Sequence, residues 1–263
     1  IVSGHCYHGG MELAYNWFPP YSYNLALFVF ISGYFYKTDY EENVGKYIWK
    51  RTKRLLIPAY LWNIFYGGMV AFLGLFGFTI GAKPDLYNLF VMPFVDGEAF
   101  QYNLGSWFVY PLFLVCIINV LFRKFLKLIH LDNEFIVLIV YLAIGMIGIN
   151  TALENPTAIN GIVKLLVRTM FFLPCYEFGR FYKAVLEKKD NLNNVAYFAI
   201  IFAVQLILLT FCKDLEYTPS SFTKFNNGFI IPYISSITAI AFWLRVSKLL
   251  VPAIGNSKLV RLI

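Results

Sequence analysis

Charged residues are scarce in this chain. Asp, Glu, Lys and Arg make up 14% of its 263 residues, whereas soluble globular domains carry roughly 25%. Hydrophobic residues reach 59%, and the mean hydropathy is +0.62. The apolar residues form blocks long enough to cross about 30 Å of hydrocarbon as helices, without the alternating polarity of barrel strands. The sequence therefore excludes a soluble globular domain and predicts an all-α protein, a polytopic transmembrane helical bundle.

Several signatures of enzymes and of metal or nucleic-acid binding are also missing. No GxSxG, P-loop, HExxH or paired-carboxylate motif occurs, so nucleophile-elbow hydrolases, nucleoside triphosphatases and zinc proteases have no support. The formal charge is +7, but the basic residues are spread over short loops, and we expect no nucleic-acid partner. The cysteines stand singly in apolar surroundings, where we expect buried thiols and no metal site; they are Cys6, Cys116, Cys175 and Cys212.

The chain shows no internal repeat and no loop long enough for a second domain, so we expect residues 1–263 to form one membrane domain. It opens at Ile1 without a methionine and stops at Ile263 within an apolar stretch, and we expect a sequence truncated at both ends. The apolar blocks predict about nine spanning segments. These are 1–10, 21–36, 55–80, 107–122, 135–153, 162–183, 195–211, 229–244 and a last one that begins near Leu249.

Basic residues are divided unevenly between alternate loops. Of the 22 Lys and Arg residues, 17 follow the second, fourth, sixth and eighth segments, and 5 belong to the opposite side. Cytoplasmic loops carry the excess of Lys and Arg in membrane proteins. We therefore expect these basic loops to face the cytoplasm. In the loop 37–54, aromatic residues beside lysines predict an interfacial amphipathic helix.

A dense basic cluster stands just before the third segment. Arg51 and Arg54 are three residues apart and share a helix face, with Lys50 and Lys53 beside them. Such cations repel one another unless an anion lies among them, and the planar fork of arginine suits phosphate. Attraction to anionic lipid accounts for the cluster as well. The residues alone favour the lipid interpretation.

Two histidines lie in the first segment. An ionisable group inside a spanning segment usually faces a cavity or a partner, and the ordinary pKa of imidazole, about 6.5, suits proton abstraction near neutral pH. His5 is accordingly a candidate general base, and a histidine hydrogen-bonded between helices is the equal alternative. His8 lies one turn further along and ranks second. We expect His130, which follows several lysines, at the surface.

Other polar and small residues admit two interpretations each. Ser32 and Gly33 form a small surface where a helix or a ligand can approach closely, and helix packing is the simpler explanation. Trp107 opens the fourth segment and is by default an interfacial aromatic anchor. The charged residues of the sixth segment either contact an anionic acceptor or pair across helices; they are Lys164, Arg168, Glu177 and Arg180.

Five blocks of sequence stand out along the chain: VSGHCYH at 2–8, FVFISGYFYK at 28–37, KRTKRLLIP at 50–58, SWFVYPLFL at 106–114 and IGNSKLVRLI at 254–263. In this order they resemble the membrane acyltransferase-3 family, which includes bacterial O-acetyltransferases of cell-surface polysaccharides. The second block is especially similar to the branch related to fucose 4-O-acetylases. Each block alone is weakly specific, but their order covers nearly the whole chain.

The resemblance implies a single acyltransferase-like domain over 1–263 in the bacterial cytoplasmic membrane. It implies transfer of an acyl group, most simply acetyl, from acyl-CoA to a hydroxyl of a cell-surface or lipid-linked sugar. Acetyl-CoA would be a co-substrate, and no cofactor would be bound. His5 would be the general base, and the donor would be held by Arg51, Arg54, Lys53, Ser32, Gly33 and Tyr34. The candidate acceptor-side residues are His8, Trp107 and Arg168.

Two other classes of function stay open on the residues alone. A transporter or exporter of polysaccharide or lipid-linked sugar would use the same histidine and cations as substrate or proton sites. It would favour inverted repeats or paired broken helices, and neither is evident in the sequence. A membrane anchor or partner subunit without chemistry would need the basic cluster for insertion only.

Overall fold

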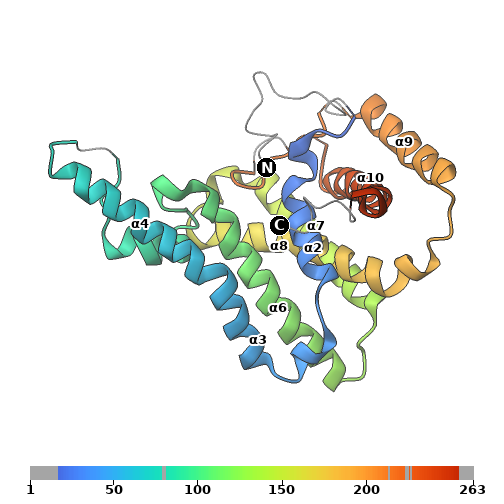
Figure 1. Cartoon of the computed structure of the whole chain (residues 1–263), viewed down its shortest axis with the longest axis horizontal. Helices are drawn as coiled ribbons and strands as arrows, with labels where there is room; N and C mark the ends of the chain where they lie inside the picture. The colour runs from blue at the N-terminus through green and yellow to red at the C-terminus, as the bar shows by residue number, and fades with distance from the viewer. Residues whose placement is uncertain (1–16, 79–80, 213, 223–224, 226, 255–263) are drawn as a thin grey trace. The chain divides into compact units, whose positions relative to one another are not determined.

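The computed structural model describes residues 17–78, 81–212, 214–222, 225 and 227–254. No strand occurs among these residues, and helices account for most of them, which confirms the all-α prediction. Contacts between Cα atoms divide the chain into two compact units. The first unit comprises 1–28, 185–218 and 223–263, and the second comprises 29–184 and 219–222. Figure 1 colours the chain along its length.

The second unit holds most of the helices. The chain enters it within α2, which spans Asn24–Tyr34. In chain order its other elements are η2 (Thr38–Glu41), α3 (Val44–Arg51), the π turn η3 (Thr52–Leu56), α4 (Ile57–Gly74), η4 (Tyr87–Val91), α5 (Met92–Val95), η5 (Gln101–Phe108), α6 (Val109–Leu128), α7 (Glu134–Glu154), η6 (Pro156–Ala158) and α8 (Gly161–Phe181).

A long helical rod forms one side of the second unit. It consists of α3, η3 and α4, and together they span 31 residues from Val44 to Gly74 (Figure 1, blue to cyan). Pro58 has no N–H group to donate to the carbonyl of Arg54, and the π turn lies just before this proline. The amphipathic helix predicted in 37–54 is therefore continuous with the third spanning segment.

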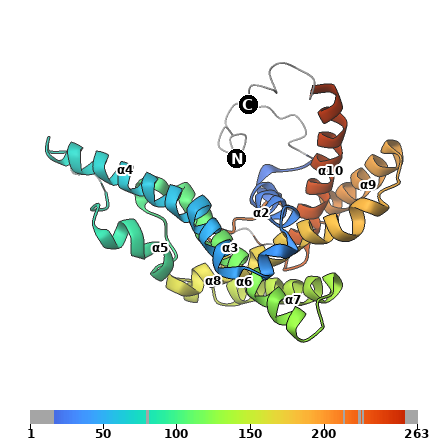
Figure 2. The ribbon, with the colours of Figure 1, turned by 60° about the horizontal axis from the view of Figure 1, so that its bottom comes forward.

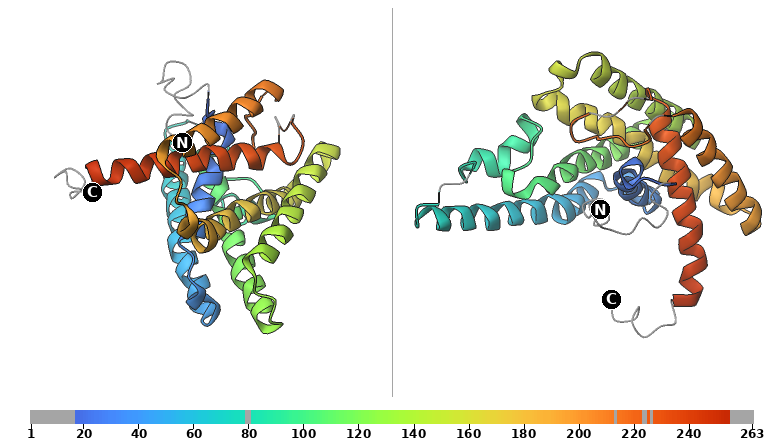
Figure 3. Two further views of the ribbon diagram at one scale, coloured as in Figure 1. Left: turned by 90° about the vertical axis from the view of Figure 1, so that its right-hand side faces the viewer. Right: turned by 90° about the horizontal axis from the view of Figure 1, so that it is seen from above.

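Helices α6, α7 and α8 build the core of the second unit. The pair α7 and α8 is joined by a short connection and packs along much of its length, and α6 packs against α8 (Figure 3, green to yellow). Asn133 caps α7, because its side chain accepts a hydrogen bond of 2.8 Å from the N–H group of Phe135. Where α7 meets α8, a Cβ atom on Gly148 would lie 2.9 Å from the Cβ of Met170.

Helices α2 and α8 approach each other at two glycines. A Cβ atom on Gly33 would lie 1.8 Å from the carbonyl oxygen of Tyr176, and one on Gly179 would lie 1.9 Å from the carbonyl oxygen of Phe30. Each glycine thus makes room for the backbone of the other helix. Small residues permit this kind of close contact between membrane helices. The structure confirms the helix-packing interpretation of Gly33.

Buried charges join four elements of the second unit. Arg123 on α6 and Glu177 on α8 are both fully buried, with 2.6 Å between Nη2 and Oε1. The same Nη2 lies 2.7 Å from Oε2 of Glu134 at the start of α7. Arg180 on α8 lies 3.0 Å from Glu134 and 3.7 Å from Glu41 of η2. Hydrogen-bonded partners offset the cost of desolvating each charge.

The first unit contains two long helices, which lie side by side in Figure 2 (orange and red). Tyr197 donates a hydrogen bond of 3.1 Å to the carbonyl of Ala241, and Arg245 lies 3.2 Å from the carboxylate of Asp190. The elements of this unit are η1 (Pro20–Ser22), η8 (Glu187–Lys189), α9 (Asn194–Phe211) and α10 (Ile231–Ile254), and the π turn η7 (Tyr182–Leu186) leads into it.

Five helices among the described residues are long and apolar enough to cross a membrane: 44–74, 101–128, 134–154, 194–211 and 231–252. The predicted sixth segment coincides with α8, whose 21 residues include four charged ones, and the predicted second segment contains the apolar α2. The stretch from Leu249 to Ile254 continues α10, and the first predicted segment lies outside the described residues. The structure confirms a helical membrane bundle.

The glycine contacts generate a first prediction, for Gly33→Ala and Gly179→Ala. Each added methyl group would overlap a backbone carbonyl that cannot move aside, so we expect each variant to lose about 1–3 kcal/mol of stability. Thermal unfolding of the detergent-solubilised protein measures the loss. Gly68→Ala on α4 is the matched control, because nothing lies within 4 Å of its added Cβ atom. Equal melting temperatures for all three variants would contradict the close approach of α2 and α8.

Glu41 generates a second prediction, on the pH dependence of stability. This residue is 3% exposed, and burial raises the pKa of its carboxyl group against the opposing effect of Arg180. The folded protein therefore keeps a proton that the unfolded chain has released. The free energy of unfolding that Glu41 contributes therefore falls as the pH rises. The fall begins near the pKa of glutamate in the unfolded chain, about 4.3, and ends above the higher pKa of Glu41 in the folded protein.

We expect Glu41→Gln to remove this pH-dependent loss. Glutamine keeps the size of the side chain and an oxygen that accepts the 3.3 Å hydrogen bond from Tyr36. Melting temperatures measured upward from about pH 4.3, the ordinary glutamate value, should show the variant gaining on the parent protein as the pH rises through the folded pKa of Glu41. The exposed neighbour Glu42 provides the control, and Glu42→Gln should follow the parent. Parallel curves for Glu41→Gln and the parent would count against the interpretation.

Candidate functional site

Arg51 lies at the end of α3 and is partly exposed. Its Nε donates a hydrogen bond of 3.0 Å to the hydroxyl of Tyr47, one helical turn earlier, and its guanidinium carbon lies 5.1 Å from the centre of the Tyr47 ring. The Tyr47 hydroxyl in turn lies 3.4 Å from the hydroxyl of Tyr176 on α8. The fully buried thiol of Cys116, on α6, belongs to the same cluster. The guanidinium group of Arg51 thus lies near the hydroxyls of Tyr47 on α3 and Tyr176 on α8.

The other cations of the basic cluster are exposed or partly exposed, and two of them lie beside aromatic rings. Lys53 and Arg54 are exposed in the π turn, and the Nζ of Lys53 lies 5.1 Å from the centre of the Trp49 ring. Lys50 donates a hydrogen bond of 3.3 Å to the hydroxyl of Tyr40. Single π turns within α-helices are frequent at functional sites.

This cluster differs from the buried arginines in its partners. Within the described part of the chain, no salt bridge joins any cation from 50–54 to a carboxylate. Arg123 and Arg180, in contrast, each contact at least two carboxylates. The charges of 50–54 are therefore not neutralised by a carboxylate of the described residues, and an external anion can neutralise them.

Tyr176 connects the basic cluster to the predicted donor-side residues of α2. Its backbone carbonyl lies against Gly33, while its hydroxyl lies beside that of Tyr47. Ser32 is partly buried on the same helix, and the ring of Tyr34 lies 5.0 Å from the Nζ of Lys183. Tyr176 thus contacts Gly33 through its backbone and Tyr47, the hydrogen-bond partner of Arg51, through its hydroxyl.

The predicted acceptor-side residues Trp107 and Arg168 also come together. The guanidinium carbon of Arg168 lies 4.8 Å from the centre of the Trp107 ring, which stacks on Phe172 with the ring centres 6.4 Å apart. Arg168 is 2% exposed, and it donates hydrogen bonds to the carbonyls of Gly97 and Ser220. These bonds join two loops to α8 beside the tryptophan.

The remaining histidines fall in different places. His5 and His8 lie outside the described residues, so the geometry around them stays a prediction. His130 is exposed at the end of α6, in agreement with its predicted surface position. Its φ angle of 57° places it in the left-handed region, in the turn that follows the helix.

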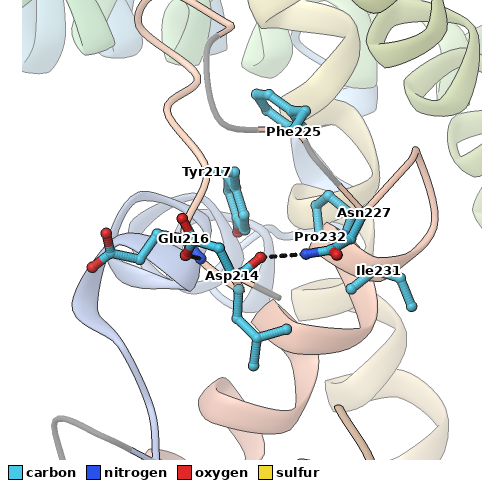
Figure 4. A pocket seen from close by; sticks show the side chains of 8 residues that line it. Asp214, Glu216, Tyr217, Phe225, Asn227, Ile231 and Pro232 are labelled. Atoms are coloured by element: carbon cyan, nitrogen blue, oxygen red, sulfur yellow. Dashed lines mark hydrogen bonds between the residues drawn. The ribbon is translucent and has the colours of Figure 1, made fainter. Parts of the chain in front are cut away.

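Each unit contains a hollow that is lined by described residues. Figure 4 shows the polar one, which is lined by backbone and side chains of 214–217 and by Asn227, whose amide donates to the carbonyl of Asp214. The other is an apolar groove of about 440 Å³, including the space at its mouth, along α4 between Tyr66 and Tyr102. Neither is lined by the cations of 50–54.

The tyrosines of the basic cluster are the residues that sequence reasoning missed. The aromatic residues of 37–54, Tyr47 among them, predict only an interfacial helix. Tyr47 and Arg51 are nevertheless four residues apart, which is the spacing of neighbours on one helix face. Tyr176 is 129 residues from Tyr47, and no local pattern connects them.

Comparison with known families agrees with this arrangement. The acyltransferase-3 family model, described as an acyltransferase domain, matches residues 1–263. No curated protein and no solved structure matches the chain. The family match spans every residue of the sequence, and the structure has five helices suited to cross a membrane. The chain therefore belongs to the membrane acyltransferase-3 family and is a membrane acyltransferase.

Proposed function

We propose that this acyltransferase moves an acyl group, most simply acetyl, from acyl-CoA to a hydroxyl of a cell-surface or lipid-linked sugar. The observation that supports the proposal most directly is the cluster at 50–54, whose cations have no carboxylate partner among the described residues and whose Arg51 is hydrogen-bonded to Tyr47, a neighbour of Tyr176. CoA carries several phosphates. Arginine binds phosphate through two parallel N–H bonds, and lysine binds it as a point charge.

The donor would lie across the junction of α2, α3 and α8. In this proposal Arg51 and Arg54, aided by Lys53, hold the phosphates of CoA. The pantetheine arm then passes Ser32 and Tyr34 toward the first spanning segment, while Gly33 keeps α2 packed against the backbone of Tyr176. The distribution of Lys and Arg between loops supports a cytoplasmic location for this end, where acyl-CoA is available, and the family resemblance supports the bacterial cytoplasmic membrane.

The chemical step would be direct transfer with His5 as general base. Neutral imidazole takes the proton of the acceptor hydroxyl, and the hydroxyl oxygen forms a bond to the thioester carbonyl carbon. The carbon–sulfur bond then breaks, and the CoA thiolate leaves and takes up the proton. The products are the O-acylated sugar and free CoA. No cofactor is needed for this sequence.

The acceptor side would be formed by His8 and by the neighbourhood of Trp107. The N–H groups that Arg168 donates to Gly97 and Ser220 are already engaged, and its positive charge lies against the tryptophan ring. We therefore assign Arg168 the role of holding Trp107 and the two loops in place. The sugar would pack beside this tryptophan.

The proposed base generates a third prediction, for His5→Ala. A positioned general base contributes about 10²- to 10⁴-fold, so we expect kcat to fall by at least about 100-fold with little change in the KM for acetyl-CoA. Release of CoA thiol by the purified protein in the presence of a sugar acceptor measures this. His130→Ala changes an exposed histidine and is the control. Full activity of His5→Ala at equal expression would exclude the proposed base.

The cation cluster generates a fourth prediction, for Arg51→Ala and Arg54→Ala. Loss of charge-assisted hydrogen bonds worth about 1.5–3 kcal/mol corresponds to a rise of about 10- to 150-fold in the dissociation constant for CoA. Titration calorimetry of the detergent-solubilised protein checks the change. Lys124→Ala removes an exposed cation outside the cluster and should bind CoA like the parent.

Two results would decide against this function. If charge reversal at Arg51 and Arg54 changed membrane insertion but not CoA binding, the cluster would serve as an anchor. If the purified protein bound sugar yet released no thiol from acetyl-CoA, a transporter would explain the binding better.

A further inference from the structure

The guanidinium group of Arg51 is fixed along one edge. Its Nε donates to the Tyr47 hydroxyl at 3.0 Å, and the same tyrosine ring lies within cation–π distance, at 5.1 Å. Among the described residues, neither Nη1 nor Nη2 of Arg51 has a hydrogen-bond partner, and the residue is partly exposed. The edge that carries Nη1 and Nη2 is therefore available to a ligand.

Tyr47 is itself held on several sides. The residue is 2% exposed, and its ring stacks on that of Tyr40 with the centres 4.6 Å apart and the planes at 27°. The ring of Tyr36 meets it edge-on at 6.0 Å, and its hydroxyl lies 3.4 Å from that of Tyr176. A ring packed in this way has one orientation, so the hydroxyl presents a fixed acceptor to Arg51.

These contacts have a consequence for anion binding. Arginine recognises phosphate best when the plane of its guanidinium group is already aligned, because little conformational entropy is then lost on binding. We infer that Tyr47 is a positioning residue, whose hydroxyl aligns Arg51 so that Nη1 and Nη2 bind a phosphate of acyl-CoA in a bidentate manner. This inference rests on the proposed function, which places acyl-CoA at the basic cluster.

The proposed role belongs to the hydroxyl of Tyr47 and not to its ring. Tyr47→Phe keeps the stacking on Tyr40 and removes only the acceptor for Arg51. Tyr40→Phe is the matched control, because it removes a hydroxyl whose partner is Lys50 rather than Arg51. If the tyrosines served packing alone, both variants would change melting temperature at most, and neither would change donor binding.

The test measures steady-state kinetics with acetyl-CoA and CoA affinity by calorimetry, for the full-length protein in detergent. We expect Tyr47→Phe to raise both the KM for acetyl-CoA and the dissociation constant for CoA about three- to tenfold, the usual effect of one lost hydrogen bond, with kcat unchanged. Tyr40→Phe should match the parent protein. In the Arg51→Lys background, where no Nε exists, Tyr47→Phe should cause no further change.

Each other outcome would overturn the inference. Equal KM values for Tyr47→Phe and the parent, while Arg51→Ala weakens CoA binding, would remove the positioning role and leave the proposed function intact. The same loss in the parent and Arg51→Lys backgrounds would mean that Tyr47 acts independently of Arg51. No CoA binding by the parent protein would remove the proposed function and the inference together. If Tyr47→Phe fails to fold, Arg51→Lys must itself show the rise in KM with kcat unchanged, and an unchanged KM would again overturn the role.

Discussion

The structure of the second unit depends on a short stretch of α8, from Tyr176 to Arg180. Helix α2 packs against the backbone carbonyl of Tyr176 and against Gly179. The carboxylate of Glu177 neutralises Arg123 of α6. Arg180 reaches Glu134 at the start of α7. A buried charge in hydrocarbon must find its partner within a few ångströms, so these ion pairs fix the mutual position of three helices more narrowly than apolar contact does.

Much of the fold follows from composition along the chain. The free energy of transfer into a bilayer depends on the residues of one segment, so the hydropathy blocks predicted the positions of α4, α6, α7, α9 and α10. Two features required knowledge of other helices. Arg123 belongs to the basic residues assigned to the loop after the fourth segment, but it lies within α6, where Glu177 and Glu134 offset the cost of its buried charge. At Pro58 the helix continues, with a π turn just before the proline.

Part of the candidate site was predictable because its cations are close together in the sequence. The cations of 50–54 are adjacent in sequence, and their spacing alone places Arg51 and Arg54 on one face. Their relation to Gly33 depends on Tyr176, which enters from a helix more than a hundred residues later, and no pattern in one sequence reveals a contact of that kind. The pairing of Trp107 with Arg168 is similar, because the two residues come from α8 and the segment before α6.

The arginines of the second unit illustrate how one residue type serves two purposes in a membrane protein. Arg123 and Arg180 have carboxylate partners, so their charge is compensated within the fold and they contribute to its geometry. Arg51 lies at the end of α3, and the hydrogen-bond partner described for it is the uncharged hydroxyl of Tyr47. A hydroxyl can orient a guanidinium group without neutralising it, so the charge of Arg51 is left to be balanced by an anion from outside the protein. A carboxylate in place of Tyr47 would stabilise the same rotamer more strongly, but it would compete with phosphate for the cation. A neutral acceptor therefore suits the proposed donor site, which would have to hold an anionic donor and then release it.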